Sequence, residues 1–115
     1  MKIDRQKVHN KYGGHCAYCG REITIEEMQV DHFIPQYLDK KNGNNPNNDI
    51  SNLMPSCSEC NRYKSTESIE TIRRYLENTK QKLLKTQNLR ILNRLGGFYI
   101  SEKPIRFYFE TFINN

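Results

Sequence analysis

Four cysteines stand in two Cys-x-x-Cys pairs, Cys16 with Cys19 and Cys57 with Cys60. Four thiolates at this spacing can close a tetrahedral shell around zinc, and such a shell leaves no open position for a substrate. The spacing therefore predicts a structural zinc ion that joins the two pairs. Catalytic chemistry must then come from residues that lie between the pairs or directly after them.

Other uses of the cysteines are less favoured by their arrangement. A single pair could be a redox site, but two pairs without a βαβ pattern favour zinc. His15, beside Cys16, could replace a thiol, although four sulfurs suffice. A redox or zinc-handling protein stays an alternative class, and it predicts thiols that cycle or a zinc ion that exchanges readily.

The residues around the pairs could hydrolyse a phosphodiester, which needs a base for water, a cation for the developing charge and donors for the backbone. His32 can act as a neutral base near pH 7. Asp31 and Asn61 offer hard oxygen atoms suited to Mg²⁺ or Mn²⁺. The cations that could neutralise phosphate are Arg21, Arg62 and Lys64.

The elements that must position these residues follow from the pattern around them. Residues 28–34 alternate as in a strand, so Asp31 and His32 point to opposite faces and need different roles. A helix from residue 58 onward would carry Asn61. Because zinc would pin Cys60, the neighbouring Asn61 would be held near the strand.

Length and composition predict one domain, 1–115, because 115 residues are too few for two ordinary cores. Only 36% of residues are hydrophobic and the mean hydropathy is −0.87, so a metal would supplement a modest core. The formal net charge of +5 is typical of a protein that meets a polyanion. The expected parts are an N-terminal helix over 1–12, a zinc-bound core over 13–67, and a helical extension with a terminal hairpin over 68–115.

Within these parts, turn-forming residues predict an exposed loop over 39–49. Helical spacing predicts helices from Ser65 to about Thr86, with Ser65 or Ser68 as the cap, and from Asn88 to Leu95, ending at Gly96. The tail fits a strand or a helix face, and we favour a hairpin in which 98–100 pairs with 105–109. Lys80, Lys82 and Lys85 suit a solvated helix face or a nucleic-acid backbone equally well.

The motif order resembles the HNH endonucleases: a Cys-x-x-Cys pair, Asp31-His32, the run Asp49–Leu53, and then Cys57–Lys64. The resemblance implies an α+β, zinc-stapled ββα-metal core, similar to a treble clef. It makes His32 the general base and Asn61 the third motif position, and it gives the divalent ion to Asp31 and Asn61.

By the same resemblance, Asn52 is the middle asparagine, which ties the loop between the strands and orients the histidine. The long Asn-rich loop leaves Asn47 and Asn48 as alternatives. Asn52 is preferred because Leu53 follows it and because of its distance from Cys57.

The expected function is therefore divalent-metal-dependent hydrolysis of DNA, one strand per site, with duplex DNA as the favoured partner. The alternative is a non-catalytic, zinc-bound nucleic-acid-binding module, which would be indifferent to His32→Ala. The sequence has no apolar run of the roughly 18 residues that a bilayer requires, so we expect a soluble, cytoplasmic protein of bacterial or phage type. A monomer and a homodimer remain equally open.

Overall fold

The computed structural model describes residues 3–41, 43 and 47–112. The chain forms two compact units, each of which is described by itself. The core unit consists of Met1–Ile69 and Arg106–Asn115, and the helical unit consists of Glu70–Ile105. The single-domain organisation expected from the sequence stays a prediction.

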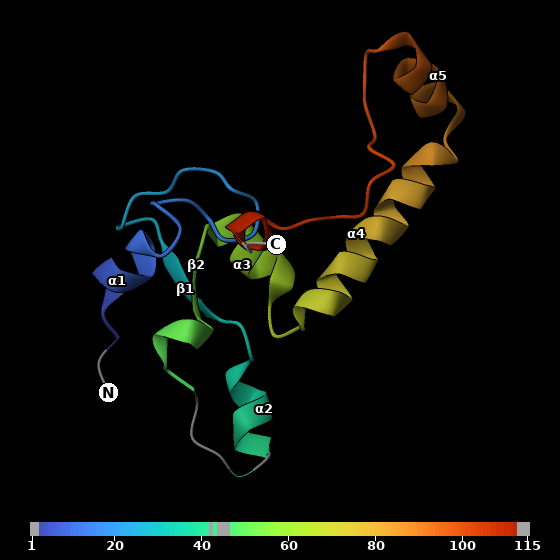
Figure 1. Cartoon of the computed structure of the whole chain (residues 1–115). Helices are drawn as coiled ribbons and strands as arrows, with labels where there is room; N and C mark the ends of the chain where they lie inside the picture. Colours follow the sequence, from blue (N-terminus) through green and yellow to red (C-terminus); the bar gives the residue numbers. More distant parts are fainter. Residues whose placement is uncertain (1–2, 42, 44–46, 113–115) are drawn as a thin grey trace. The chain divides into compact units, whose positions relative to one another are not determined.

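The centre of the core unit is a two-stranded antiparallel sheet of β1 (Gln29–His32) and β2 (Leu53–Ser56), seen in Figure 1. Asp31 pairs with Met54 and His32 with Leu53. Helix α3 (Ser58–Lys64) begins two residues after β2. This ββα arrangement confirms the fold class that the motifs predict.

Helix α1 (Arg5–Asn10) begins at Asp4, whose side chain accepts hydrogen bonds from the backbone N–H groups of Gln6 and Lys7. It buries Val8 completely. The chain then turns through two glycines with positive φ into the knuckle, which we define as Cys16–Gly20. The Ala17 N–H donates to the Pro55 carbonyl at 2.8 Å, so the knuckle is fixed to β2.

Helix α2 (Gln36–Lys41) and the 3-10 turn η1 (Ile50–Asn52) come between the two strands in the sequence. The exposed loop predicted over 39–49 is wrong at its start, because residues 39–41 are helical. Pro35 precedes α2, and Gln, Leu and Lys are good helix formers, so the turn composition begins only at Asn42. Residues 42 and 44–46 of the predicted loop lie outside the described residues.

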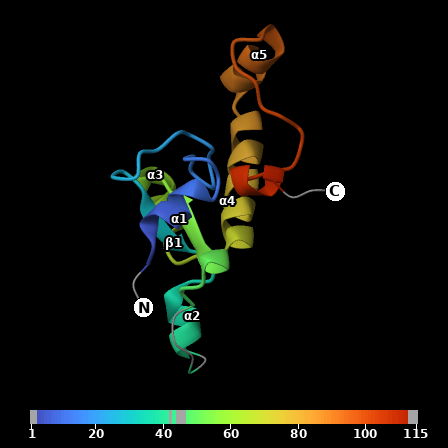
Figure 2. The ribbon, with the colours of Figure 1, turned by 60° about the vertical axis from the view of Figure 1, so that its left-hand side comes forward.

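Helix α4 (Ile69–Leu84) begins directly after Ser68, one of the two expected cap positions, and α5 (Gln87–Leu95) ends at Gly96 with φ 83°, as predicted. Within the helical unit, residues 100–105 return beside α4, which Figure 2 shows from a second direction. Arg73 donates to the Ile105 carbonyl at 2.6 Å and Lys80 to the Lys103 carbonyl at 2.7 Å.

The terminal hairpin predicted for 98–100 and 105–109 is wrong, since these described residues contain no strand. The last described element is instead the 3-10 helix η2 (Tyr108–Phe112). The N–H groups of Tyr108 and Phe109 donate to the carbonyls of Tyr18 and Ala17. The alternating aromatic residues therefore pack on the knuckle instead of pairing with a second strand.

Candidate metal centre and active site

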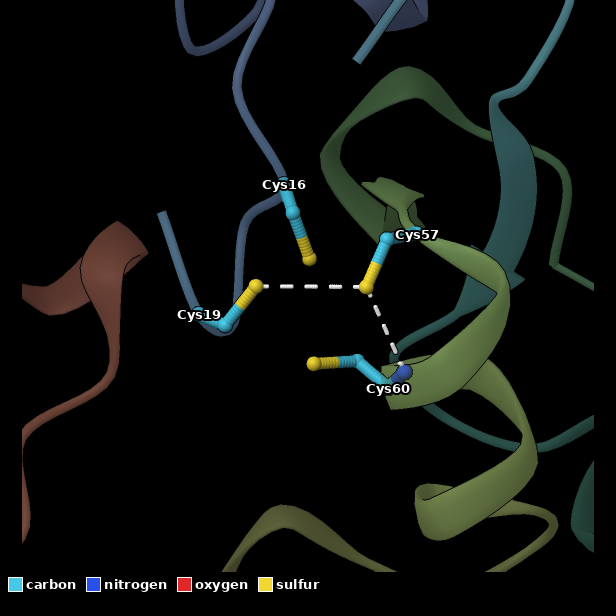
Figure 3. Close-up of side chains that lie close together, drawn as sticks. All are labelled: Cys16, Cys19, Cys57 and Cys60. Carbon is cyan, nitrogen blue, oxygen red and sulfur yellow. Dashed lines mark hydrogen bonds between the residues drawn. The ribbon is translucent and has the colours of Figure 1, made fainter. Parts of the chain in front are cut away.

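The four cysteine sulfurs converge on one point, as Figure 3 shows: two come from the knuckle and two from the start of α3. All four lie within 4.8 Å of one another, and the Sγ atoms of Cys19 and Cys57 are 3.9 Å apart. A tetrahedron with zinc–sulfur bonds of about 2.3 Å has edges of about 3.8 Å. The sulfurs are therefore already spaced for a tetrahedral ion.

Local structure explains this convergence. Gly20 has φ 82°, which favours glycine, and its N–H donates to the Cys16 carbonyl to close the knuckle. Cys57 is the N-cap of α3, and its sulfur accepts from the Cys60 N–H at 3.4 Å. A hydrogen bond from Cys60 lowers the pKa of Cys16, and the same bond raises the pKa of Cys60. One thiolate therefore forms readily, and zinc would displace the remaining thiol protons.

His15 takes no part in this cluster. Its Nδ1 lies 3.2 Å from the Tyr12 carbonyl oxygen, and its Nε2 lies 4.0 Å from the Glu22 carboxylate. The metal-binding cluster found among the described residues consists of cysteines alone.

Asp31 is 7% exposed, and a single one of its oxygens, Oδ2, receives two contacts. The Tyr18 hydroxyl donates to Oδ2 at 2.5 Å, and the Lys64 ammonium lies 3.1 Å from it. Burial raises the pKa of Tyr18 well above its ordinary range, with the Asp31 charge as a further cause, so the hydroxyl stays a donor. The carboxylate is thus tied to both the knuckle and the end of α3.

Sequence reasoning missed Tyr18. The available signal was its place inside the first Cys-x-x-Cys pair, where zinc would hold an aromatic hydroxyl in a fixed position. Its target could not be known before β1 was placed against the knuckle.

His32 ends β1 and is half-buried. Its Nε2 lies 2.7 Å from the Asn48 side-chain oxygen, and an amide oxygen only accepts. Nε2 therefore donates, and the lone pair that can take a proton remains on Nδ1. The Gln36 amide nitrogen is 3.4 Å from the same Nε2, but two donors cannot bond each other.

The two functions that the resemblance gives to Asn52 fall on different residues. Asn52 is 4% exposed and ties the loop, because its Oδ1 accepts from the Ile34 N–H at 2.8 Å and its amide donates to the Asn47 carbonyl at 2.9 Å. The contact to the His32 ring comes from Asn48. The Asn-rich composition marked this loop in the sequence, but the composition could not separate one asparagine from another.

Asn61 does not contact Asp31 in the part of the chain that the structure describes. Its amide donates to the Gln29 side chain at 3.2 Å, one turn of α3 before Lys64 meets Asp31. Arg21 and Arg62 are exposed, as phosphate-binding residues would be. Lys64 is different, because its side chain is 2% exposed and its charge faces Asp31.

A pocket of about 330 Å³ opens beside the strand end. Its lining includes both Asp31 and His32, the last two residues of β1. The pocket is lined by Val30, Asp31, His32, Pro35, Gln36, Tyr37, Ser65 and Thr66. It has room for a phosphate group and water next to both residues.

These residues fit a divalent ion at Asp31. The carboxylate borders the pocket, and both of its contacts fall on Oδ2. Hard cations prefer carboxylate and amide oxygens, so Asn61 could serve as a second ligand once its amide leaves Gln29. The cysteine cluster therefore has the soft sulfur ligands that suit zinc, while the pocket has the hard carboxylate oxygens of Asp31, which suit Mg²⁺ or Mn²⁺.

Comparison with known proteins agrees with this geometry. Residues 16–67 match the HNH endonuclease family. These residues include the cysteine cluster, both strands and α3. Among the described residues, no helix has the length and apolar content needed to cross a bilayer.

Two bacterial proteins with similar sequences are nucleases by name. The chain is 35% identical over 69 residues to the Retron Vc95 putative HNH endonuclease of Vibrio cholerae serotype O1 biovar El Tor, across 56% of this chain and 31% of that protein. It is 42% identical over 50 residues to the CRISPR-associated endonuclease Cas9 of Actinomyces naeslundii, across 44% of this chain and 4% of that one.

The crystal structure of the Type II-C Cas9 enzyme from Actinomyces naeslundii matches with a TM-score of 0.51 and 33% identity. The match covers 61% of this chain and 7% of the Cas9 chain. The chain thus spans less than a third of the length of these relatives. Residues 16–67, which hold the cysteine cluster and the ββα core, thus match the HNH endonuclease family, and it is through these residues that the chain resembles it.

Proposed function

We propose that the chain is a metal-dependent endonuclease that hydrolyses DNA phosphodiester bonds, one strand per site, around a structural zinc ion. The observation that carries the proposal is the pocket that both His32 and Asp31 border, with the His32 ring held at Nε2 by Asn48. A base and a metal-binding carboxylate at one opening are the parts that this hydrolysis needs.

In this proposal, His32 takes a proton from water at Nδ1 while the water oxygen bonds to phosphorus. The bond from phosphorus to the 3′ oxygen breaks, the leaving oxygen takes a proton from solvent water, and His32 returns its proton to solvent, which leaves a 5′ phosphate and a 3′ hydroxyl. A divalent ion, Mg²⁺ or Mn²⁺, held by Asp31 and Asn61 would supply charge stabilisation at the leaving oxygen. Arg21 and Arg62 are exposed, which suits contacts to the DNA backbone.

The zinc ion has a structural role here. Its four cysteines would hold the knuckle against the start of α3, and these two elements supply Tyr18 and Lys64, the contacts of Asp31. Zinc would therefore fix the carboxylate without touching the substrate.

The test is cleavage of supercoiled plasmid by zinc-loaded protein with Mg²⁺ or Mn²⁺, compared with His32→Ala. Loss of a general base lowers the rate by about 10²–10⁴-fold. The matched control is His15→Ala, because His15 lies outside both the cysteine cluster and the pocket. Zinc content and thermal unfolding are measured for each protein.

We expect wild type and His15→Ala to nick the plasmid, and His32→Ala to lose nicking while it keeps zinc. Equal behaviour of wild type and His32→Ala, with binding but no cleavage of plasmid, single-stranded DNA or RNA, would instead identify a non-catalytic nucleic-acid-binding module.

A further inference from the structure

The excess positive charge of the chain lies entirely in the helical unit. Residues 70–105 contain eight Lys and Arg against three Asp and Glu, a net charge of +5. The core unit contains ten of each sign and is neutral. The unit that carries the candidate active site therefore offers no net attraction to a polyanion, while the other unit does.

The charges of α4 fall into an internal and an external group. The internal group binds within the helical unit. Arg73 pairs with Glu70 and donates to the carbonyl of residue 105. Lys80 pairs with Glu77 and donates to the carbonyl of residue 103. These bonds hold the returning segment against the helix. The two residues are therefore structural.

The external group is formed by Arg74 and Lys82 of α4 and by Lys85 in the turn directly after the helix, which are exposed and have no ion pair with a described residue. At 100° per residue, Arg74 and the polar Asn78 and Gln81 of α4 share an arc of about 60°, with Lys82 about 40° beyond it, and Lys85 follows in the turn after the helix. We call this surface the basic face. The buried Ile72 lies on the opposite side of the helix.

The basic face has the dimensions of a nucleic-acid contact. Eight residues separate Arg74 from Lys82, which is about 12 Å along the helix, and Lys85 follows directly after its end. Duplex DNA presents a phosphate charge about every 1.7 Å of its axis. Long cationic side chains over this length can each reach a phosphate, and neighbouring amides can donate further hydrogen bonds.

We propose that the helical unit binds the phosphate backbone of the DNA that the core unit cuts, through the basic face of α4. This inference rests on the proposed function for the identity of the nucleic acid. The binding is sequence-independent, because flexible cations on one face contact the backbone and read no base edges. The neutral core unit then supplies the chemistry, and the helical unit supplies most of the affinity.

The test is equilibrium binding of two unrelated DNA duplexes of equal length across a salt series, with zinc-loaded full-length protein in the His32→Ala background. The test variant is Lys82→Gln with Lys85→Gln. Two lost phosphate contacts reduce the slope of log affinity against log salt by about two, and they weaken binding roughly tenfold near physiological salt. Both duplexes are affected equally.

Two matched controls separate charge from surface change. Asn78→Ala with Gln81→Ala alters the same face without removing charge. Lys7→Gln with Lys41→Gln removes two charges from exposed positions of the core unit. We expect both controls to keep the wild-type salt slope, and circular dichroism verifies that α4 remains folded in every variant.

The outcomes for binding and cleavage are distinguishable. An unchanged salt slope in Lys82→Gln with Lys85→Gln overturns the basic face, even if wild type cleaves plasmid normally. A reduced slope supports it, even if wild type cuts nothing and the proposed function fails. Binding of the full-length protein to phosphatidylserine vesicles is measured as well. If the protein binds these vesicles as tightly as DNA or more tightly, and Lys82→Gln with Lys85→Gln loses that binding, the inference is also overturned.

Discussion

Tyr18 connects the cysteine cluster to Asp31 of the candidate active site through one hydrogen bond. Its backbone belongs to the knuckle, and its hydroxyl meets Asp31 at 2.5 Å in a site where the tyrosine is only 6% exposed. Tyr18→Phe removes that donor and keeps the ring. A hydrogen bond to a charged group contributes about 1.5–3 kcal/mol, so the free energy of unfolding should fall by that amount.

The same variant should keep its zinc and require more Mg²⁺ for half-maximal cleavage, because Asp31 loses the contact that orients it. Metal titration of cleavage and zinc content measure the two effects separately. Loss of zinc from Tyr18→Phe, or an unchanged Mg²⁺ requirement, would contradict a positioning role for Tyr18.

The raised pKa of Tyr18 also predicts how stability depends on alkaline pH. The folded state binds this proton more tightly than the unfolded chain, whose tyrosines ionise near 10. The stabilisation is therefore complete below pH 10 and is lost progressively as pH rises above it. Denaturant unfolding at several values above pH 9 should show a shallower loss in Tyr18→Phe than in wild type.

Asn48 should fix the tautomer and the ring orientation of His32. Asn48→Ala removes the acceptor for Nε2–H, so the ring can turn or change tautomer, and we expect the cleavage rate to fall about tenfold, less than the 10²–10⁴ of losing the base. Asn48→Asp keeps an oxygen acceptor and should restore most of the rate. Single-turnover cleavage compares the two variants, and a rate for Asn48→Ala equal to wild type would remove Asn48 from the site.

At the scale of elements, the cysteine cluster brings the knuckle and the start of α3 together, and zinc would join these two segments. Cys57→Ser should abolish stoichiometric zinc and unfold the core unit, because structural zinc supplies folding free energy directly. Metal affinity should also fall as pH is lowered, since protons compete for the thiolates. Zinc analysis and circular dichroism with and without chelator measure both effects, and a folded, zinc-free Cys57→Ser protein would contradict this role.

The sequence predicted the elements whose signals are local. β1, α3 and α5 follow from alternation, cysteine spacing and a C-terminal glycine, and the structure has all of them. α2 was missed because its six residues border a turn-rich segment. The tail pattern, with Ile105, Phe107 and Phe109 at every second position, suits a strand, but the backbone partner that decides its conformation is the knuckle, more than eighty residues earlier.

The site shows the same division between local and distant information. Residue type and spacing predicted the four-cysteine cluster, which the structure has, and singled out the pair Asp31-His32, which borders one pocket. The partners of that pair, Tyr18, Lys64 and Asn48, depend on how β1 packs against the knuckle, α3 and the loop. The sequence suggested Lys64 as a cation for phosphate, but Lys64 forms a buried ion pair with Asp31 instead. The side chain of Asp31 is 9% exposed, and a buried carboxylate needs a cation.

For the molecule as a whole, the core unit is closed by a segment that follows the helical unit in the sequence. The rings of Phe107 and Phe109 are stacked with their centroids 6.3 Å apart, and each ring makes a T-shaped contact with the ring of Tyr18. Tyr108 lies so close to Gly20 that a Cβ there would approach its ring within 2.7 Å. The helical unit is therefore inserted between two segments of one core.

This connectivity predicts that the tail stabilises the metal centre. Phe107 is 5% exposed, and Phe107→Ala should lower the free energy of unfolding by roughly 3–5 kcal/mol and speed the release of zinc to a chelator, because Tyr18 loses its packing. Phe112 is 49% exposed, so Phe112→Ala is the matched control and should cost much less. Denaturant unfolding and the rate of zinc transfer to a chromogenic chelator measure both. If zinc leaves Phe107→Ala no faster than wild type, the tail packs on the knuckle without supporting its metal.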